Sequence, residues 1–218
     1  MPVDTAEFRK YLGAAMEALN SRGTTRNISD LKIPETISTF SEFGLYDEWV
    51  LSVSRDLIDH RIDSLSLSDV LELVFPLCRL QKNAVLLNRD MVRLVESVNR
   101  QFSGNTIIKW RLWINLLECM HRIGLENKQV SRIAIDELAS KVSIMNGNEI
   151  MAVVNVCVAH NYIHSVFLSR VIKFAPIVSL TCQELTVLEH LVNLGGQQSK
   201  EDIAWLTRYI KFTCSEKI

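Results

Sequence analysis

The chain has 218 residues, 48% of them hydrophobic and 22% charged, a composition that excludes a disordered chain and supplies side chains for an extended core. Its formal net charge of −1 excludes a strong overall electrostatic field that would attract a polyanion such as a nucleic acid. Its longest apolar runs, such as residues 150–158, are much shorter than the roughly 20 residues that a membrane-spanning helix needs, so we expect no membrane insertion.

We expect residues 1–30 to form an N-terminal helix and a polar linker. Asp4 and Glu7 have the spacing of a capping residue and a first-turn acid, and apolar residues follow at helical intervals up to residue 22. Residues 22–30 (RGTTRNISD) are polar. The segment resembles neither a secretory signal nor a transit peptide, which indicates a cytoplasmic protein unless a targeting segment has been removed or is atypical.

Residues 31–218 are expected to form one helical-repeat domain. Apolar residues recur at three- and four-residue intervals, and the strict alternation of strands is rare. Breaks recur in steps of 37, 43, 37 and 34 residues, within the range of helical-hairpin repeats. Glycine and asparagine tolerate the left-handed backbone beyond a helix end, and they occupy all but one of the break positions. These positions are Gly44, Gln81, Gly124, Asn161 and Gly195, with Gln81 as the exception.

Helix starts are marked in the same register by a capping side chain three residues before an acid. The capping oxygen accepts from the backbone at the helix start, and the acid complements the helix dipole. Pro76 falls within a predicted helix, where it should kink the helix or mark an earlier boundary. The capping pairs are Ser66 with Asp69, Asn146 with Glu149, Thr181 with Glu184, and Ser199 with Asp202.

The first helix of each pair is the more apolar one. In residues 110–123 and 150–158, apolar side chains cover most of the helix circumference, as in helices that pack on several sides. Trp110 and Trp113 have the chemistry to stack on bases, but their apolar neighbours favour a place in the core. We predict an all-α fold: an α-solenoid of about five antiparallel helix-hairpin repeats with an extra N-terminal helix.

Basic residues are in modest excess in the middle of the chain, where residues 66–180 carry 13 basic and 9 acidic groups. Within residues 84–102, arginines form a stripe beside the apolar one. Cations in such a strip add salt-sensitive affinity for phosphates. The alternative is a solvated helix face balanced by Asp90 and Glu96. The candidate nucleic-acid-binding residues are Arg89, Arg93, Arg100, Lys109 and Arg111.

The C-terminal residues 200–218 form the candidate partner-docking segment. Trp205 lies at helical spacing with other apolar residues, and apolar side chains continue to the last residue. We expect this end to dock on a partner, so that deletion of residues 200–218 abolishes assembly of the complex. The candidate docking residues are Trp205, Tyr209, Phe212 and Ile218.

The cysteines and histidines do not indicate a metal site or a catalytic centre. Five cysteines without a short paired spacing favour free thiols in a reducing compartment. Cys157, His160 and His164 have a spacing that suits zinc, but Cys157 belongs to an apolar helix and no fourth ligand is near. Phosphate-binding glycine loops and hydrolase motifs are absent from the sequence. We expect no metal, no cofactor, no small-molecule substrate and no enzymatic activity.

The repeated unit combines a capped acidic helix start, an apolar run, an apolar residue followed by Gly, and an amphipathic helix. It resembles the degenerate repeats of roughly 38 residues found in organellar RNA-metabolism proteins of the FAST-kinase and RAP-domain type, also called heptatricopeptide or octotricopeptide repeats. The resemblance covers residues 33–218 and is best in residues 66–105, 106–145 and 181–218. It implies a mitochondrial protein of RNA processing, RNA stability or the mitochondrial ribosome.

These features predict a non-catalytic scaffold within an organellar ribonucleoprotein assembly, which binds other protein subunits with RNA as a second partner. The alternative keeps the fold and omits RNA: a protein-only scaffold, an accessory subunit of a respiratory or ATP-synthase complex, or a cytoplasmic adaptor. Near-neutral charge favours this alternative. A helical enzyme domain is a weaker alternative, and its signature would be a deep polar pocket with converging acids or histidines.

Overall fold

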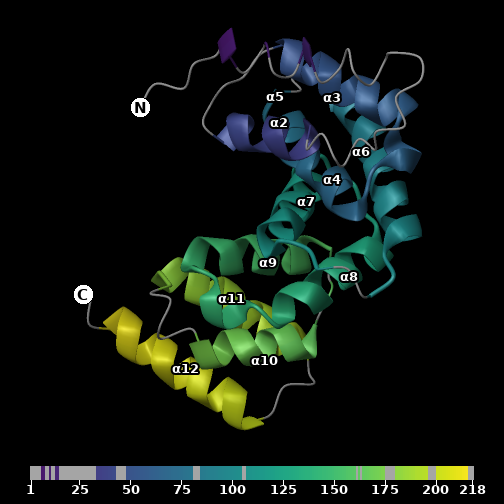
Figure 1. Ribbon diagram of the computed structural model, residues 1–218. Helices are drawn as coiled ribbons and strands as arrows, with labels where there is room; N and C mark the ends of the chain where they lie inside the picture. Colours follow the sequence, from purple (N-terminus) through teal and green to yellow (C-terminus); the bar gives the residue numbers. More distant parts are fainter. Residues whose placement is uncertain are drawn as a thin grey trace. The chain divides into compact units, whose positions relative to one another are not determined.

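The computed structural model describes residues 33–42, 48–80, 84–104, 107–160, 162, 164–174, 180–195 and 200–215, together with five helical positions in the first 14 residues. Every regular element in this part of the chain is a helix, and none is a strand (Figure 1). The prediction of an all-α fold is therefore confirmed for the described residues. The chain divides into two compact units, Met1–Leu112 and Trp113–Ile218. The predicted boundary between residues 30 and 31 lies outside the described residues.

The first unit is built from short helices around an apolar centre. Its elements are α2 (Ile33–Glu42), α3 (Glu48–His60), the 3-10 helix η2 (Ile62–Ser64), α4 (Leu67–Glu72), α5 (Val74–Leu80) and α6 (Ala84–Gln101). Helix α4 packs on α2, α5 and α6, and α5 also contacts α2 and α3. Removal of apolar side chains from water is the main term that stabilises these contacts. The buried side chains include Ile33, Ile37, Val50, Leu57, Val70, Leu71, Leu77 and the predicted stripe of α6, namely Leu87, Met91, Leu94, Val95 and Val98.

The boundary between α4 and α5 follows from the chemistry of Pro76. The proline nitrogen carries no hydrogen, and the ring clashes with the carbonyl four residues earlier, which belongs to Glu72. Helix α4 ends at Glu72 and α5 begins at Val74. The predicted earlier boundary is therefore confirmed. At the start of α4, Ser66 and Asp69 form the predicted capping box.

The second unit contains longer helices. Helix α7 (Trp110–Arg122) begins just before the unit boundary, and α8 (Lys128–Ala139), the 3-10 helix η3 (Val142–Ile144), α9 (Gly147–Ala159), α10 (Ser165–Phe174), α11 (Cys182–Gly195) and α12 (Lys200–Ser215) follow. Helix α8 packs on α10, α9 packs on α11, and α12 contacts both α10 and α11. Trp113 is 1% exposed, so its predicted place in the core is confirmed. Other buried residues are Leu116, Leu117, Val130, Ile135, Leu138, Ile150, Val153, Val154, Phe167, Leu168, Val171, Leu185, Leu188 and Leu191.

Helix ends in the second unit agree with the predicted signals. Gly124 has a φ of +67°, and it donates to the His121 carbonyl while Leu125 donates to the Met120 carbonyl, which together form a Schellman motif. The predicted capping boxes are also present at the starts of α9 and α11. Gly195 is the last residue of α11. The other predicted signals, at Gly44, Gln81, Asn161 and Ser199, lie outside the described residues.

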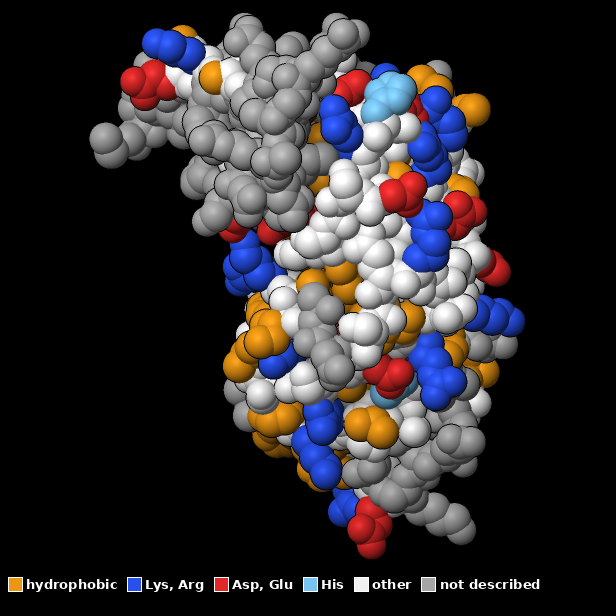
Figure 2. All heavy atoms as spheres, turned by 45° about the vertical axis from the view of Figure 1, so that its right-hand side comes forward, with side chains coloured by type: hydrophobic (Ala, Val, Ile, Leu, Met, Phe, Trp, Pro, Cys, Tyr) orange, Lys and Arg blue, Asp and Glu red, His pale blue; other side chains and the backbone are white. Residues whose placement is uncertain are grey.

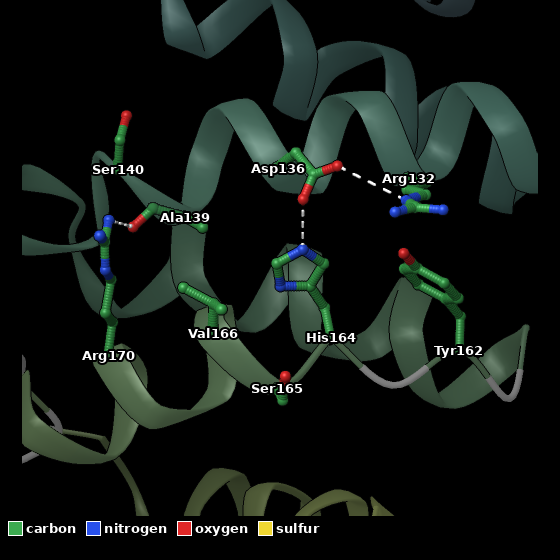
Figure 3. Close-up of a pocket in the computed structure, with 9 residues that line it drawn as sticks. All are labelled: Arg132, Asp136, Ala139, Ser140, Tyr162, His164, Ser165, Val166 and Arg170. Atoms are coloured by element: carbon green, nitrogen blue, oxygen red, sulfur yellow. Dashed lines mark hydrogen bonds and ion pairs between the residues drawn. The ribbon is translucent and has the colours of Figure 1, made fainter.

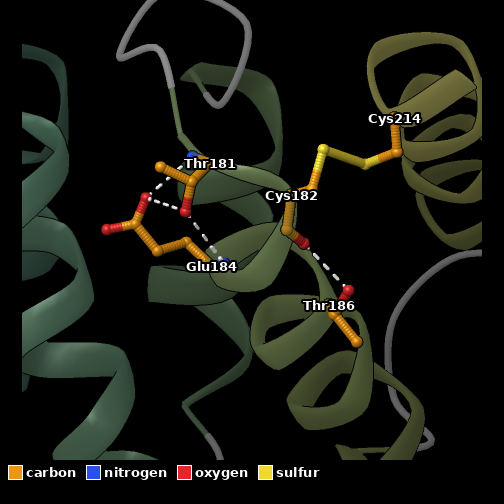
Figure 4. The surroundings of a disulfide bond; sticks show 5 residues. All are labelled: Thr181, Cys182, Glu184, Thr186 and Cys214. Atoms are coloured by element: carbon orange, nitrogen blue, oxygen red, sulfur yellow. Dashed lines mark hydrogen bonds between the residues drawn. A yellow bond between two sulfur atoms is a disulfide. The ribbon is translucent and has the colours of Figure 1, made fainter. Parts of the chain in front are cut away.

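A disulfide joins helices α11 and α12. Cys182 is the first residue of α11, Cys214 lies near the end of α12, and their Cα atoms are 5.7 Å apart (Figure 4). The expectation of free thiols is therefore wrong for this pair, and it is also wrong for Cys78 and Cys119, which are disulfide-bonded. Cys182 and Cys214 are 32 residues apart in the sequence, so no short cysteine spacing predicts the bond. They come together only because α11 and α12 pack against each other. Cys157 is a buried free thiol.

Candidate functional site

Helix α12 carries three aromatic side chains on one face. Trp205, Tyr209 and Phe212 are separated by four and three residues, so at about 100° per residue they lie within an arc of about 60°. Leu206, which is 1% exposed, and the half-buried Ile210 project from the other side of the helix. The aromatic stripe, as we call Trp205, Tyr209 and Phe212, therefore faces away from the side that anchors α12.

Two of the three side chains of the aromatic stripe are exposed, Tyr209 is half-buried, and the stripe is partly fixed in position. Trp205 is 39% exposed and Phe212 is 64% exposed. The rings of Trp205 and Tyr209 are stacked, with centroids 5.3 Å apart and planes 7° from parallel. Exposed aromatic side chains are typical of the central residues of protein interfaces. Because the stacked pair is already ordered, a partner that covers it loses less side-chain entropy on binding.

One cationic side chain accompanies the aromatic stripe. Arg208 is exposed at one edge of the stripe, where its Nε atom donates to the Ala204 carbonyl at 3.2 Å, whereas Lys211 is exposed about 100° further round the helix from Phe212. Three of the four predicted docking residues thus lie together on one helix face. The fourth, Ile218, lies outside the described residues.

The predicted nucleic-acid-binding strip lies in the first unit, where two of its arginines bind carboxylates of α3 and α6. Arg89 donates to Asp90 at 2.7 and 2.9 Å and lies 3.4 Å from Asp59. Arg93 forms an ion pair with the same Asp59 carboxylate and also donates to the Asp59 carbonyl at 3.3 Å. These contacts fasten α6 to α3 and reduce the positive charge available to a phosphate.

Asp90 is the buried centre of this ion-pair cluster. Its side chain is 0% exposed, and besides Arg89 it faces the Nε atom of Arg55 at 3.4 Å. The Arg55 contact is an ion pair without hydrogen-bond geometry. A buried carboxylate requires such charged partners, because burial without them is strongly unfavourable. The cluster therefore has a structural role in holding α3 and α6 together.

The remaining cations of the strip also have neighbours. Arg100 donates to Asp63 at 2.9 Å, and Lys109 donates to Glu35 at 2.7 Å and to Glu72 at 3.3 Å. Burial raises the pKa of Glu72, and the hydrogen bond to Glu35 raises the pKa of Lys109. The exposed Arg111 guanidinium lies 5.1 Å from the centroid of the Trp110 ring. On the face drawn in Figure 2, Lys and Arg side chains alternate with Asp and Glu side chains and do not form one unbroken basic area among the coloured residues.

Apart from Asp90, the acidic partners of the strip were not predicted from the sequence. For two of the ion pairs the predicted repeat step is the signal that could have found them, since Arg100 bonds to Asp63 and Lys109 to Glu72 across 37 residues in both cases. Residues one repeat apart are expected to lie side by side in a chain of repeats. The two pairs of Asp59 span 30 and 34 residues and carry no such signal.

A polar pocket that the sequence did not predict lies in the second unit, between α8 and α10 (Figure 3). It has a volume of about 450 Å³. From α8 it is lined by Arg132 and Asp136, and from the opposite side by Tyr162, His164 and Arg170. Two of these residues also close helix ends, which is why the chain positions them here. Arg170 donates to the carbonyl of Ala139, the last residue of α8, and His164 caps the start of α10.

His164 and Asp136 form a pair that does not offer a free base. The Nδ1 atom of His164 accepts the backbone N–H of Phe167 at 3.0 Å, so the ring proton is on Nε2, which donates to Asp136 at 2.5 Å. Both ring nitrogens are thus engaged within the chain. The pocket has the acid and the histidine that an enzyme site would need, but neither imidazole nitrogen is available to take a proton from a substrate.

The three residues with zinc-like spacing have different neighbours. His164 binds Asp136, and the ring of His160 lies 6.4 Å from that of His121. Burial raises the pKa of the Cys157 thiol to about 12, which disfavours the thiolate that zinc requires. Among the described residues, no group of three or more His, Cys, Asp or Glu side chains is placed to hold a metal ion.

Comparisons of the chain with protein-family models, with curated proteins and with solved structures find no match. The resemblance to the organellar repeat proteins therefore stays a prediction. None of the described helices has the length and apolar character that a membrane span requires.

Proposed function

We propose that this protein is a non-catalytic helical scaffold that holds another protein subunit on the aromatic stripe of α12. The observation that carries this proposal is that Trp205, Tyr209 and Phe212 share one face of α12, on which Trp205 and Phe212 are exposed. Exposed apolar clusters of this kind mark binding surfaces. The partner that fits has an apolar groove with a carboxylate at one edge, since Arg208 lies beside the stripe.

The architecture that we propose is an α-solenoid of antiparallel helix pairs. Each repeat of a solenoid contacts its neighbours, so side-chain contacts recur at a separation close to the repeat length. The bonds from Arg100 to Asp63 and from Lys109 to Glu72 both span 37 residues, which equals a step between predicted breaks. This recurrence supports the proposal for the first unit.

The assembly that we propose is an organellar ribonucleoprotein complex, as the resemblance implies, either the mitochondrial ribosome or an RNA-processing complex. A protein-only complex is the second candidate, and the pairing of Arg89, Arg93 and Arg100 with carboxylates favours it. RNA crosslinking within the intact complex, at increasing salt, distinguishes the two. Crosslinks at these arginines that fade with salt would support RNA contact. Their absence at low salt would support the protein-only complex.

Loss of the aromatic stripe is expected to release the partner. The double substitution Trp205→Ser and Phe212→Ser removes two exposed rings without removing the buried Leu206. Interface aromatics of this kind contribute about 2 kcal/mol or more each, so loss of both is expected to lower partner affinity by about a thousandfold. Affinity purification of the full-length protein from a gentle lysate, with proteins and RNA both identified, measures this loss.

The matched control is Ile144→Ser, because Ile144 is 63% exposed, like Phe212, and lies in η3 of the same unit. It should retain every subunit that the wild-type protein retains. Equal recovery of subunits by the stripe variant and the control would refute the proposed docking surface.

A further inference from the structure

The pocket between α8 and α10 offers hydrogen-bond donors that the chain leaves unused. The Tyr162 hydroxyl makes no hydrogen bond within the described residues, and Arg170 uses only its Nη1 atom. Arg132 lies 3.7 Å from Asp136, too far for a hydrogen bond, and is 73% exposed. Three donor groups from two helices and the segment before α10 therefore line one concave surface.

The acceptors of the same pocket are already occupied. One Asp136 oxygen accepts from His164 and the other faces Arg132, so the carboxylate orients these two side chains. Both ring nitrogens of His164 are engaged within the chain, Nδ1 by the Phe167 N–H and Nε2 by Asp136. Two guanidinium groups and one carboxylate leave a net charge of +1 on the lining. Burial raises the pKa of Tyr162, so its hydroxyl keeps its proton and acts as a donor.

The size of the pocket indicates a ligand larger than a simple ion. Arg132 and Ala139 are seven residues apart on α8, which places the Arg132 end and the Arg170 end about 10 Å apart along the helix axis. In Figure 3, Arg132 and Tyr162 lie at one end and Arg170 at the other, with the Asp136–His164 pair between them. A volume of about 450 Å³ is within the range of small-molecule sites.

We propose that this pocket binds phosphoryl groups carried by a ligand of nucleotide size, with oxyanions at both ends of the pocket. Guanidinium and hydroxyl donors match phosphoryl oxygens, which only accept hydrogen bonds. The ligand is either a free nucleotide-sized organic phosphate or a stretch of RNA backbone, since both present the same group. The paired arginines of the first unit do not offer free donors to a phosphoryl group, because their donors are directed at carboxylates of the chain.

The test is a titration of the full-length protein with a nucleoside 3′,5′-bisphosphate and, separately, with a short oligouridine, both followed by calorimetry. Arg132→Gln removes the positive charge and the guanidinium donors, and Tyr162→Phe removes the hydroxyl donor. Arg170→Lys keeps the charge but loses the planar donor set. We expect each substitution to weaken binding about tenfold, as for hydrogen bonds to a charged group. Lys128→Gln is the matched control, because Lys128 is exposed at the start of the same helix and does not line the pocket.

The two titrations distinguish the source of the phosphate. Binding of the bisphosphate alone identifies a small-molecule ligand, and binding of oligouridine that the pocket substitutions weaken identifies RNA. Failure of both probes to bind at millimolar concentration overturns the inference. The inference is also overturned if Lys128→Gln weakens binding of the probes as much as the pocket substitutions do. Circular dichroism checks that each variant is folded, and Tyr162→Phe retains the ring that packs there.

This inference goes beyond the proposed scaffold function and is separable from it. The pocket and the aromatic stripe share no residue. The stripe variant should therefore bind the bisphosphate as the wild-type protein does, even if the proposed docking surface is wrong.

Discussion

Replacement of Asp90 by alanine is expected to destabilise the contact between α3 and α6 by about 3 kcal/mol. The carboxylate is 0% exposed and forms ion pairs with both Arg89 and Arg55, so its removal breaks the Arg55 ion pair and leaves Arg89 with Asp59 alone. Arg89 is 49% exposed and Arg55 28% exposed, so both retain some access to water. We therefore expect the lower end of the usual range for a broken buried pair.

Hydrogen exchange measured by mass spectrometry on peptides of α3 and α6 is the appropriate assay, because the chain has two compact units and a single unfolding transition is not assured. The control is Asp63→Ala, which breaks the Arg100–Asp63 pair with side chains 59% and 82% exposed. Exposed pairs contribute less than about 1 kcal/mol. If Asp90→Ala and Asp63→Ala changed exchange equally, the assigned structural role of the buried cluster would be incorrect.

The second large effect concerns the disulfide that ties α12 to α11. The bond closes a loop between residues 32 apart in sequence, and the chain-entropy relation for such a loop gives about 3–4 kcal/mol of stabilisation. Helix α12 depends on this tether, because Leu206 is its one fully buried apolar side chain among the described residues. We expect Cys214→Ser to destabilise the second unit by this amount under non-reducing conditions.

Thermal unfolding of the wild-type protein and of Cys214→Ser, each with and without dithiothreitol, measures the effect of the tether. In reductant the two proteins should unfold alike, since neither then has the bond. Identical unfolding without reductant would show that the bond does not stabilise the second unit. Alkylation of free thiols followed by peptide mass spectrometry confirms which cysteines are paired in each sample.

Local features of the fold were predictable from the sequence, and long-range ones were not. The capping boxes at Ser66, Asn146 and Thr181, the boundary before Pro76 and the turn at Gly124 each depend on residues within one helical turn. The pairing of Arg89 with Asp59 spans 30 residues, and that of His164 with Asp136 spans 28. Such contacts depend on which helix faces pack together, and no local pattern specifies this.

The candidate sites also divide into one that local sequence predicted and one that depends on long-range packing. The aromatic stripe was predicted because Trp205, Tyr209 and Phe212 share a face by helical period alone. The polar pocket was missed because His164 resembled a zinc ligand and Arg170 had no recognisable partner in the sequence. Their roles depend on the backbone of two different helices, Phe167 in α10 and Ala139 in α8.

The proposed contact between the aromatic stripe of α12 and another protein subunit can be tested with a photo-crosslinking amino acid at position 212. Within the assembled complex, the probe in place of Phe212 is predicted to crosslink one protein subunit, whereas the same probe in place of the equally exposed Ile144 is predicted not to crosslink that subunit. Crosslinking of the same subunit from position 144 alone, or no protein crosslink from position 212, would contradict the claim.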